Sequence, residues 1–162
     1  MIRCVQQLGM VKLWERLKGT ADLPDVASVD GSDLDRLREK LMVLDVSRKD
    51  GEPQFLVAFH GSDYKRINSG IGVGSLLQDV MPAAVRDSGL RSYLQVLDQR
   101  LPGFAVMRVK SEAGEALSYE RLLLPFTRGG QEVEQIYCVL TLFVEDNSSP
   151  FDIVRTASGP QS

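Results

Sequence analysis

The amino-terminal part of the chain carries apolar residues at the spacing of an amphipathic helix. Polar residues separate them as far as Gly19, and glycine commonly ends helices. The apolar set is Ile2, Val5, Leu8, Leu13, Trp14 and Leu17. A helix with this stripe must bury it, and either its own domain or a second subunit can provide the cover.

The central part of the chain predicts a short helix, a β-hairpin and a longer helix. A connection rich in Asp, Pro, Ser and Gly leads to a helix that Ser32 or Asp33 can cap. Two apolar runs flank the turn dipeptide Asp50-Gly51, which is typical of a hairpin. The expected elements are a helix ending at residue 40, strands at 42–46 and 54–59, a short helix at 61–68, a flexible glycine-rich link at 69–75 and a helix at 82–100.

The last third of the chain places apolar runs between recurrent turn signals, the pattern of an antiparallel meander. Strands are expected at residues 104–111, 117–126 and 133–144. With the hairpin they predict an α+β fold, a five-stranded antiparallel sheet with helices on one face and an N-terminal helical extension. The expected organisation is an N-terminal helix and connection (1–31), one domain (32–145) and a flexible C-terminal tail (146–162).

Composition narrows the class of protein. The chain has 162 residues and is 43% apolar, enough for one core. A net charge of -3 argues against nucleic-acid binding, which needs clustered positive charge. No apolar run approaches the roughly 20 residues that span a bilayer, and the start of the chain lacks a signal-peptide pattern. Two widely separated cysteines, Cys4 and Cys138, make no disulfide framework, so we expect a cytoplasmic protein.

Several segments, in this order, resemble a bacterial PAS-domain family found mainly in alphaproteobacteria, often as small stand-alone proteins. The most specific is the strand Tyr-Glu-Arg-Leu-Leu-Leu-Pro-Phe at residues 119–126. The others are Leu13-Trp14, the runs at 41–46 and 55–62, and the glycine link 70–74 before Leu76-Leu77. The resemblance covers most of residues 10–145, and it implies a PAS-like sheet.

The resemblance implies a sensory or interaction module without general catalytic activity. The chain departs from the family at His60, where a small or apolar residue is expected, and the glycine link is about a residue short. No kinase, cyclase or DNA-binding segment is recognisable, so any output must be delivered to another protein. The sequence leaves the identity of a ligand or cofactor unknown.

The sequence argues against specific cofactor chemistry. A haem-binding PAS domain would need an axial histidine on the long helix, and His60 is the only histidine. A flavin-adduct photosensor would carry a cysteine in the helical segment after the second strand, and residues 61–80 contain none. Two cysteines and one histidine fall short of a structural zinc site. We therefore expect no haem, no flavin adduct and no metal.

A ligand pocket is expected between the sheet and the short helices, with the glycine link as a movable lid. The lining residues proposed from the sequence are Phe59, Tyr64, Ile67, Leu77, Met107 and Leu122. Arg121 and Arg108 would hold a carboxylate there if both faced the pocket; otherwise they lie on an outer sheet face or in a dimer contact. Cys138 is expected to be a small buried hydrophobe.

The leading hypothesis is a cytoplasmic, homodimeric PAS-type sensory module that binds a small ligand or a partner protein and transmits a conformational change. The residues proposed for the subunit interface are Val5, Leu13, Trp14 and Leu17. The alternatives are a ligand-free interaction or dimerisation module and a small enzyme of PAS-like fold. The absence of convergent catalytic groups argues against the enzyme.

Overall fold

The computed structural model describes residues 4–110 and 114–144 of the chain. The strands in these ranges are β1 (Leu41–Lys49), β2 (Glu52–His60), β3 (Gly103–Lys110), β4 (Ala116–Phe126) and β5 (Gln135–Val144). The helices are α1 (Val5–Lys18), α2 (Gly31–Asp35), α3 (Ser62–Ile67), α4 (Leu77–Val80) and α5 (Arg86–Gln99), with 3-10 turns η1 (Val26–Ser28), η2 (Arg38–Lys40) and η3 (Ala83–Val85). None of these helices has the length and apolar character that crossing a membrane requires.

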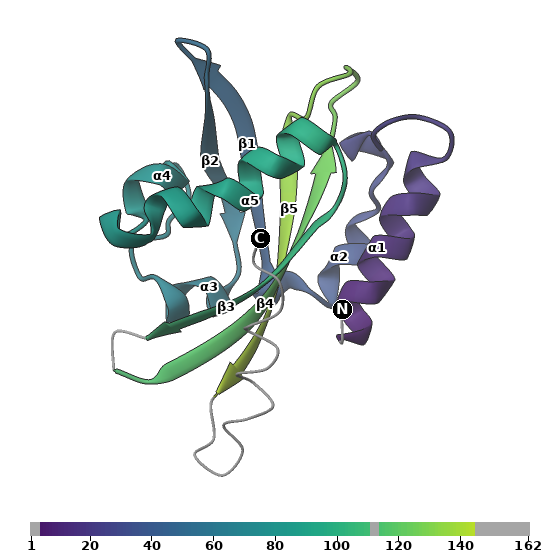
Figure 1. Cartoon of the computed structure of the whole chain (residues 1–162). Helices are drawn as coiled ribbons and strands as arrows, with labels where there is room; N and C mark the ends of the chain where they lie inside the picture. The colour runs from purple at the N-terminus through teal and green to yellow at the C-terminus, as the bar shows by residue number, and fades with distance from the viewer. Residues whose placement is uncertain (1–3, 111–113, 145–162) are drawn as a thin grey trace.

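The strands form one antiparallel sheet in the order β2-β1-β5-β4-β3 (Figure 1). The expected fold class is therefore confirmed. The hairpin turn lies where the sequence predicts it, because Asp50 and Gly51 both adopt the left-handed conformation that tight hairpins need. The helix expected as far as residue 40 is instead divided into α2 and η2.

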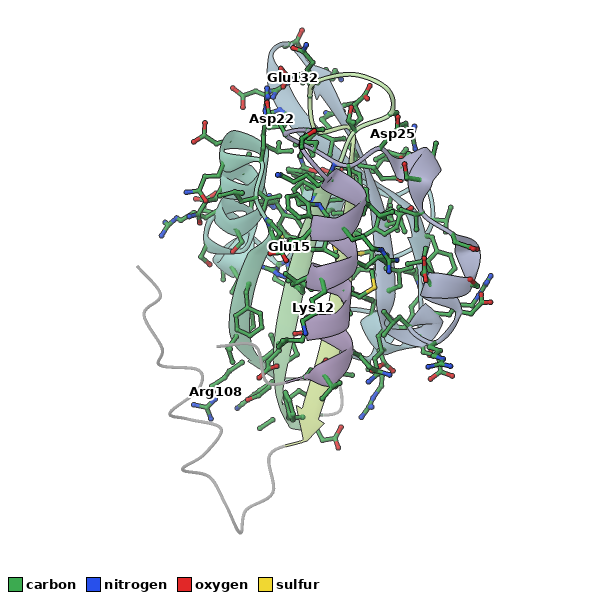
Figure 2. The ribbon with its side chains drawn as sticks, turned by 90° about the vertical axis from the view of Figure 1, so that its right-hand side faces the viewer. Lys12, Glu15, Asp22, Asp25, Arg108 and Glu132 are labelled. Atoms are coloured by element: carbon green, nitrogen blue, oxygen red, sulfur yellow. The ribbon has the colours of Figure 1, made fainter. Side chains whose placement is uncertain are left out.

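Helices cover both faces of the sheet. Helix α5 crosses one face, beside α3 and α4 (Figure 1), whereas α1 runs along the other face over β4 and β5 (Figure 2). The Gln7 side-chain amide of α1 donates to the carbonyls of Glu120 and Val139 at 3.1 Å each. Strand β4 is consequently buried on both faces, at every position from 117 to 126.

The inner stripe of α1 is formed by Gln7, Met10 and Trp14, which are buried. Trp14 is 3% exposed, and its indole N–H donates to the Pro125 carbonyl at 2.7 Å. The prediction that Trp14 belongs to a subunit interface is therefore wrong, because this chain's own sheet covers it. Leu13 and Leu17 are half-buried against the same core, and Val5 is 84% exposed.

The connection after α1 is fastened to the β4–β5 turn. Val26 N–H donates to the Thr127 carbonyl at 2.9 Å, and Thr127 N–H donates to the Pro24 carbonyl at 3.0 Å. The predicted segment 1–31 is thus joined to the sheet of the predicted domain 32–145. The predicted tail, 146–162, lies outside the described residues.

The glycine-rich link at 69–75 is hydrogen-bonded to β2 rather than free. Val57 N–H donates to the Ser75 carbonyl, and Gly74 N–H donates to the Val57 carbonyl, both at 2.9 Å. The Asn68 side chain accepts from Gly70 N–H and donates to the Val80 carbonyl. The prediction of a flexible link is therefore corrected: its polar side chains hold it in a defined loop.

Candidate functional site

A charged side chain lies in the core between the sheet and α5. Arg121 of β4 is only 4% exposed, and its guanidinium carbon lies 4.7 Å from the ring centre of Tyr93 in α5. Its Nη1 donates to the Tyr93 hydroxyl at 3.4 Å. Because side chains alternate along a strand, Tyr119 lies on the same face as Arg121. The face under α5 is thus built around a cation and aromatic rings.

Two further side chains complete this group. Tyr64 of α3 donates its hydroxyl to the Cys138 carbonyl at 3.0 Å, and the Cys138 thiol interacts electrostatically with Arg121. Cys138 pairs with Leu123 of β4, two residues from Arg121, so it lies on the same face. We call this group the Arg121 cluster: Tyr64, Tyr93, Tyr119, Arg121 and Cys138. It joins α3, α5, β4 and β5.

The protonation states of the Arg121 cluster follow from burial. Burial raises the pKa of Tyr64, Tyr93 and Tyr119, although the nearby Arg121 charge acts in the opposite direction. Burial by itself lowers the pKa of Arg121, but electrostatic interaction with the tyrosines, Tyr93 first, outweighs that effect and raises it. Within the cluster a charged guanidinium is therefore surrounded by neutral hydroxyls.

The Arg121 guanidinium is incompletely paired. Its Nε and Nη2 are buried and have no hydrogen-bond partner among the described residues. The adjacent carboxylate, Glu120, lies on the opposite face because neighbouring strand residues alternate. Buried charges are ordinarily paired and fully hydrogen-bonded, since an unpaired one is destabilising by several kcal/mol, so this cluster is the candidate functional site.

The residues proposed for a pocket are only partly brought together. Tyr64 belongs to the Arg121 cluster, Met107 pairs with Tyr119, and Leu77 is buried in the core. The prediction that Leu122 lines the pocket is wrong, because this residue lies on the face of β4 that α1 covers. The prediction for Phe59 is also wrong. Phe59 pairs with Val43 on the face of the sheet opposite to Arg121, where the Arg38 guanidinium lies over its ring. Ile67 is half-buried against the core.

The sequence pointed to part of the candidate site and missed the rest. Tyr93 lies within the helix predicted at residues 82–100, and nothing in its spacing marks its hydroxyl as a partner of Arg121. Arg108 does not join Arg121, because it pairs with Ser118 and so lies on the opposite face. His60 remains at the strand end, its Nδ1 3.3 Å from the Gly61 carbonyl oxygen. No group of metal-ligating side chains converges within the described ranges.

The two cysteines should react very differently with alkylating reagents. Burial raises the pKa of the Cys138 thiol to about 12, so at pH 8 only about one molecule in 10⁴ carries the reactive thiolate there. At Cys4, burial raises the pKa, but the polar groups around the thiol, Thr141 first, outweigh it and lower the pKa. We expect iodoacetamide at pH 8 to add one group, at Cys4, and intact and peptide mass spectrometry to locate it. The urea-unfolded chain is the control and should take up two groups; rapid alkylation of native Cys138 would contradict the buried site.

Comparison with known proteins identifies the family. The model of the PAS domain family matches residues 4–141. The chain therefore belongs to the PAS domain family, whose fold is typical of sensory signalling modules. No curated protein matches it.

Solved structures similar to this chain include a light-oxygen-voltage domain studied with a flavin analogue, with a TM-score of 0.49 and 9% identity over 76% of this chain and 90% of that one. An RNA-binding light-oxygen-voltage receptor has a TM-score of 0.46 and 16% identity over 74% of this chain, which spans 35% of the receptor chain. A sensory box histidine kinase/response regulator from Burkholderia thailandensis E264 has a TM-score of 0.43 and 14% identity, over 72% of this chain and 86% of that chain.

Proposed function

We propose that this PAS domain is a cytoplasmic sensory module that takes a small ligand into its core and converts binding into a shift of α3, α4 and α5. The observation that carries this proposal is the Arg121 guanidinium, buried in the PAS core with two unpaired N–H donors. A closed structural core would place an apolar residue or a paired ion there. In a ligand-binding core, such donors can form hydrogen bonds to the bound ligand.

The elements over the Arg121 cluster suit such a movement. Helices α3 and α4 are short, and a few polar contacts join them to the sheet. Tyr64 donates to the Cys138 carbonyl, and Gln78 accepts from Phe55 N–H while donating to the Pro53 carbonyl. Because Arg121 is enclosed, a ligand that reaches it must displace these elements, which couples binding to a change of surface. This is a population shift between two arrangements.

We propose no catalytic activity. The tyrosines and the thiol of the Arg121 cluster have raised pKa values, so none of these described side chains is an activated nucleophile or general base. The site is therefore suited to binding rather than to turnover.

Native mass spectrometry of the freshly purified protein tests the proposed function. We expect a mass excess that disappears on denaturation, together with slower amide exchange in residues 62–80 when the ligand is present. The same spectrum tests the proposed homodimer. A native mass equal to that of the chain alone, combined with no ligand-dependent change in amide exchange, would refute the sensory function.

A second candidate function is a docking module, and one surface feature favours it. An open groove of about 580 Å³ lies between α1 and α2, with buried Met10 and Leu37 among its lining residues. Three exposed cations, Lys12, Arg16 and Arg36, rim this α1–α2 groove, and none has a partner among the described residues. Asp33 is the acidic lining residue, so the groove is locally positive in a chain of net charge -3.

The charge and position of the α1–α2 groove suit an acidic amphipathic helix of a partner protein. The groove lies between two helices, away from the open sheet edges at β2 and β3, so a peptide cannot bind there by adding a strand. Gly9 lines the groove, and nothing lies within 4 Å of where its side chain would be. A partner helix can therefore approach the α1 backbone closely.

Reversing the charge of one cation in the α1–α2 groove should lower the affinity for such a partner helix by about tenfold or more. Amphipathic 16-residue peptides selected on the wild-type protein should be rich in Asp and Glu and should bind Arg16→Glu weakly in fluorescence anisotropy. Arg91→Glu, an exposed site on α5, is the matched control and should bind as the wild type does. Selected peptides that lack acidic residues, or equal binding to both variants, would exclude the acidic helix. A dimer that dissociates in Gly9→Leu would assign the groove to a second copy of the chain.

A further inference from the structure

The unpaired donors of Arg121 define a geometry as well as a charge. Nη1 is occupied by the Tyr93 hydroxyl, whereas Nε and Nη2 are unpaired among the described residues. These two nitrogens lie along one edge of the planar guanidinium, and their N–H bonds run nearly parallel. Such a fork matches the two oxygens of a carboxylate, which accepts both hydrogen bonds at once.

Among the residues that the structure describes, no acidic side chain pairs with Arg121. The side chains with the largest electrostatic influence on its pKa are Tyr93, Tyr119, Cys138 and Tyr64, all neutral at physiological pH. The Asp45 carboxylate is bound to Arg128 at the sheet margin, and its partner Gln135 lies there too. The charge of Arg121 is therefore available to a ligand.

The charge balance selects the ligand class. One buried cation matches one negative charge, so a monocarboxylate leaves the site neutral. A phosphate would bring close to two negative charges at pH 7, and the Arg121 cluster has no second cation to balance them. The rings of Tyr93, Tyr119 and Tyr64 around the guanidinium suit an apolar or aromatic body attached to the carboxylate.

We infer that the ligand of this PAS domain is a small monocarboxylic acid whose carboxylate binds side-on to Nε and Nη2 of Arg121, with its apolar body among the tyrosine rings. This inference rests on the proposed sensory function and names the chemistry of its ligand. The carboxylate supplies the acceptors that the core lacks. Binding displaces the elements that enclose Arg121, which links this recognition to the proposed movement.

Thermal unfolding with acetate, propionate and benzoate as probes tests the inference. The salts are compared with sodium chloride at equal ionic strength. We expect benzoate to raise the Tm of the wild-type protein by about 3 °C or more. Arg121→Met should lose this rise and still fold, because apolar residues commonly replace buried ions without loss of stability. Arg121→Lys should retain little of it, because an ammonium keeps the charge without the planar fork.

The matched control is Arg91→Met, which replaces an exposed arginine of α5. This variant should keep the full rise in Tm. A second measurement follows the Nε–H signal of Arg121 by nuclear magnetic resonance, which benzoate should shift in the wild-type protein. An equal rise in Tm for Arg121→Met, or an unmoved Nε–H signal, would overturn the inference.

The failure of this inference is distinguishable from the failure of the proposed function. Native mass spectrometry that reveals a bound molecule without a carboxyl group would overturn the monocarboxylate and leave the sensory function in place. A bare native mass with no response to any of the three carboxylates would overturn both.

Discussion

Replacing Gly61 by alanine should lower the free energy of unfolding by about 3 kcal/mol or more, or prevent folding. Gly61 joins β2 to α3, and its N–H donates to the Leu41 carbonyl at 2.7 Å. A Cβ there would lie well inside 3.0 Å of the carbonyl oxygens of Arg38 and Glu39, in η2. Those atoms are backbone, so the clash cannot be relieved by a side-chain rotation.

Urea unfolding of two separate variants, Gly61→Ala and Gly9→Ala, checks this expectation. Gly9 is also a glycine, but it lies within α1 and no atom lies within 4 Å of its Cβ position. Alanine is the better helix former by about 1 kcal/mol, so Gly9→Ala should stabilise the protein. If Gly61→Ala unfolded at the wild-type urea concentration, the packing of η2 against the β2–α3 turn described above would be incorrect.

Much of the sheet could be predicted from the sequence, because strand signals are local. Side chains alternate with a period of two, so the face partners of Arg121, namely Tyr119 and Leu123, follow from counting along the strand. The turn at Asp50-Gly51 is equally local, since few residue types adopt its backbone conformation. The pairing of the last three strands followed from their order and from short connections.

The candidate site could not be predicted in the same way, because its key property is the burial of Arg121, which depends on the helices that cover the faces of β4. Counting along β4 places Arg121 and Glu120 on opposite faces, but it does not show whether either face is covered. An arginine in a strand ordinarily lies at a solvated surface, and no local pattern along the chain indicates that α5 covers it. The relation between Arg121 and Tyr93 spans 28 positions and exists only after folding.

The conformation of the loop at 69–75 depends on polar side chains that lie beside its glycines. Glycines alone predict a flexible link, yet Asn68 stands two residues before Gly70 and accepts its N–H at 2.9 Å. This is the usual turn-forming role of asparagine. Ser75 likewise bonds to Gly72 through its hydroxyl. The polar residues beside the glycines, more than the glycines, determine the conformation of the loop.

Trp14→Ala should be destabilising by about 3 to 5 kcal/mol, because it removes a large side chain from a packed interface between α1 and the sheet. The indole also donates to the Pro125 carbonyl at 2.7 Å, so its loss leaves a buried acceptor without that bond. Trp14→Phe keeps most of the apolar contact and should have a smaller effect, of about 1 to 3 kcal/mol. Val5→Ala, at an exposed position of the same helix, should change stability by less than about 0.5 kcal/mol.

The dependence of the Trp14→Ala effect on protein concentration separates packing within one chain from packing between subunits. Unfolding linked to dissociation of a dimer shifts to higher denaturant as protein concentration rises, whereas unfolding within one chain does not. Because α1 packs on its own sheet through Gln7, Met10 and Trp14, we expect the loss caused by Trp14→Ala to be the same over a hundredfold range of concentration. A loss that grows on dilution would mean that α1 also stabilises a dimer, with Trp14 acting through the helix rather than through a contact of its own.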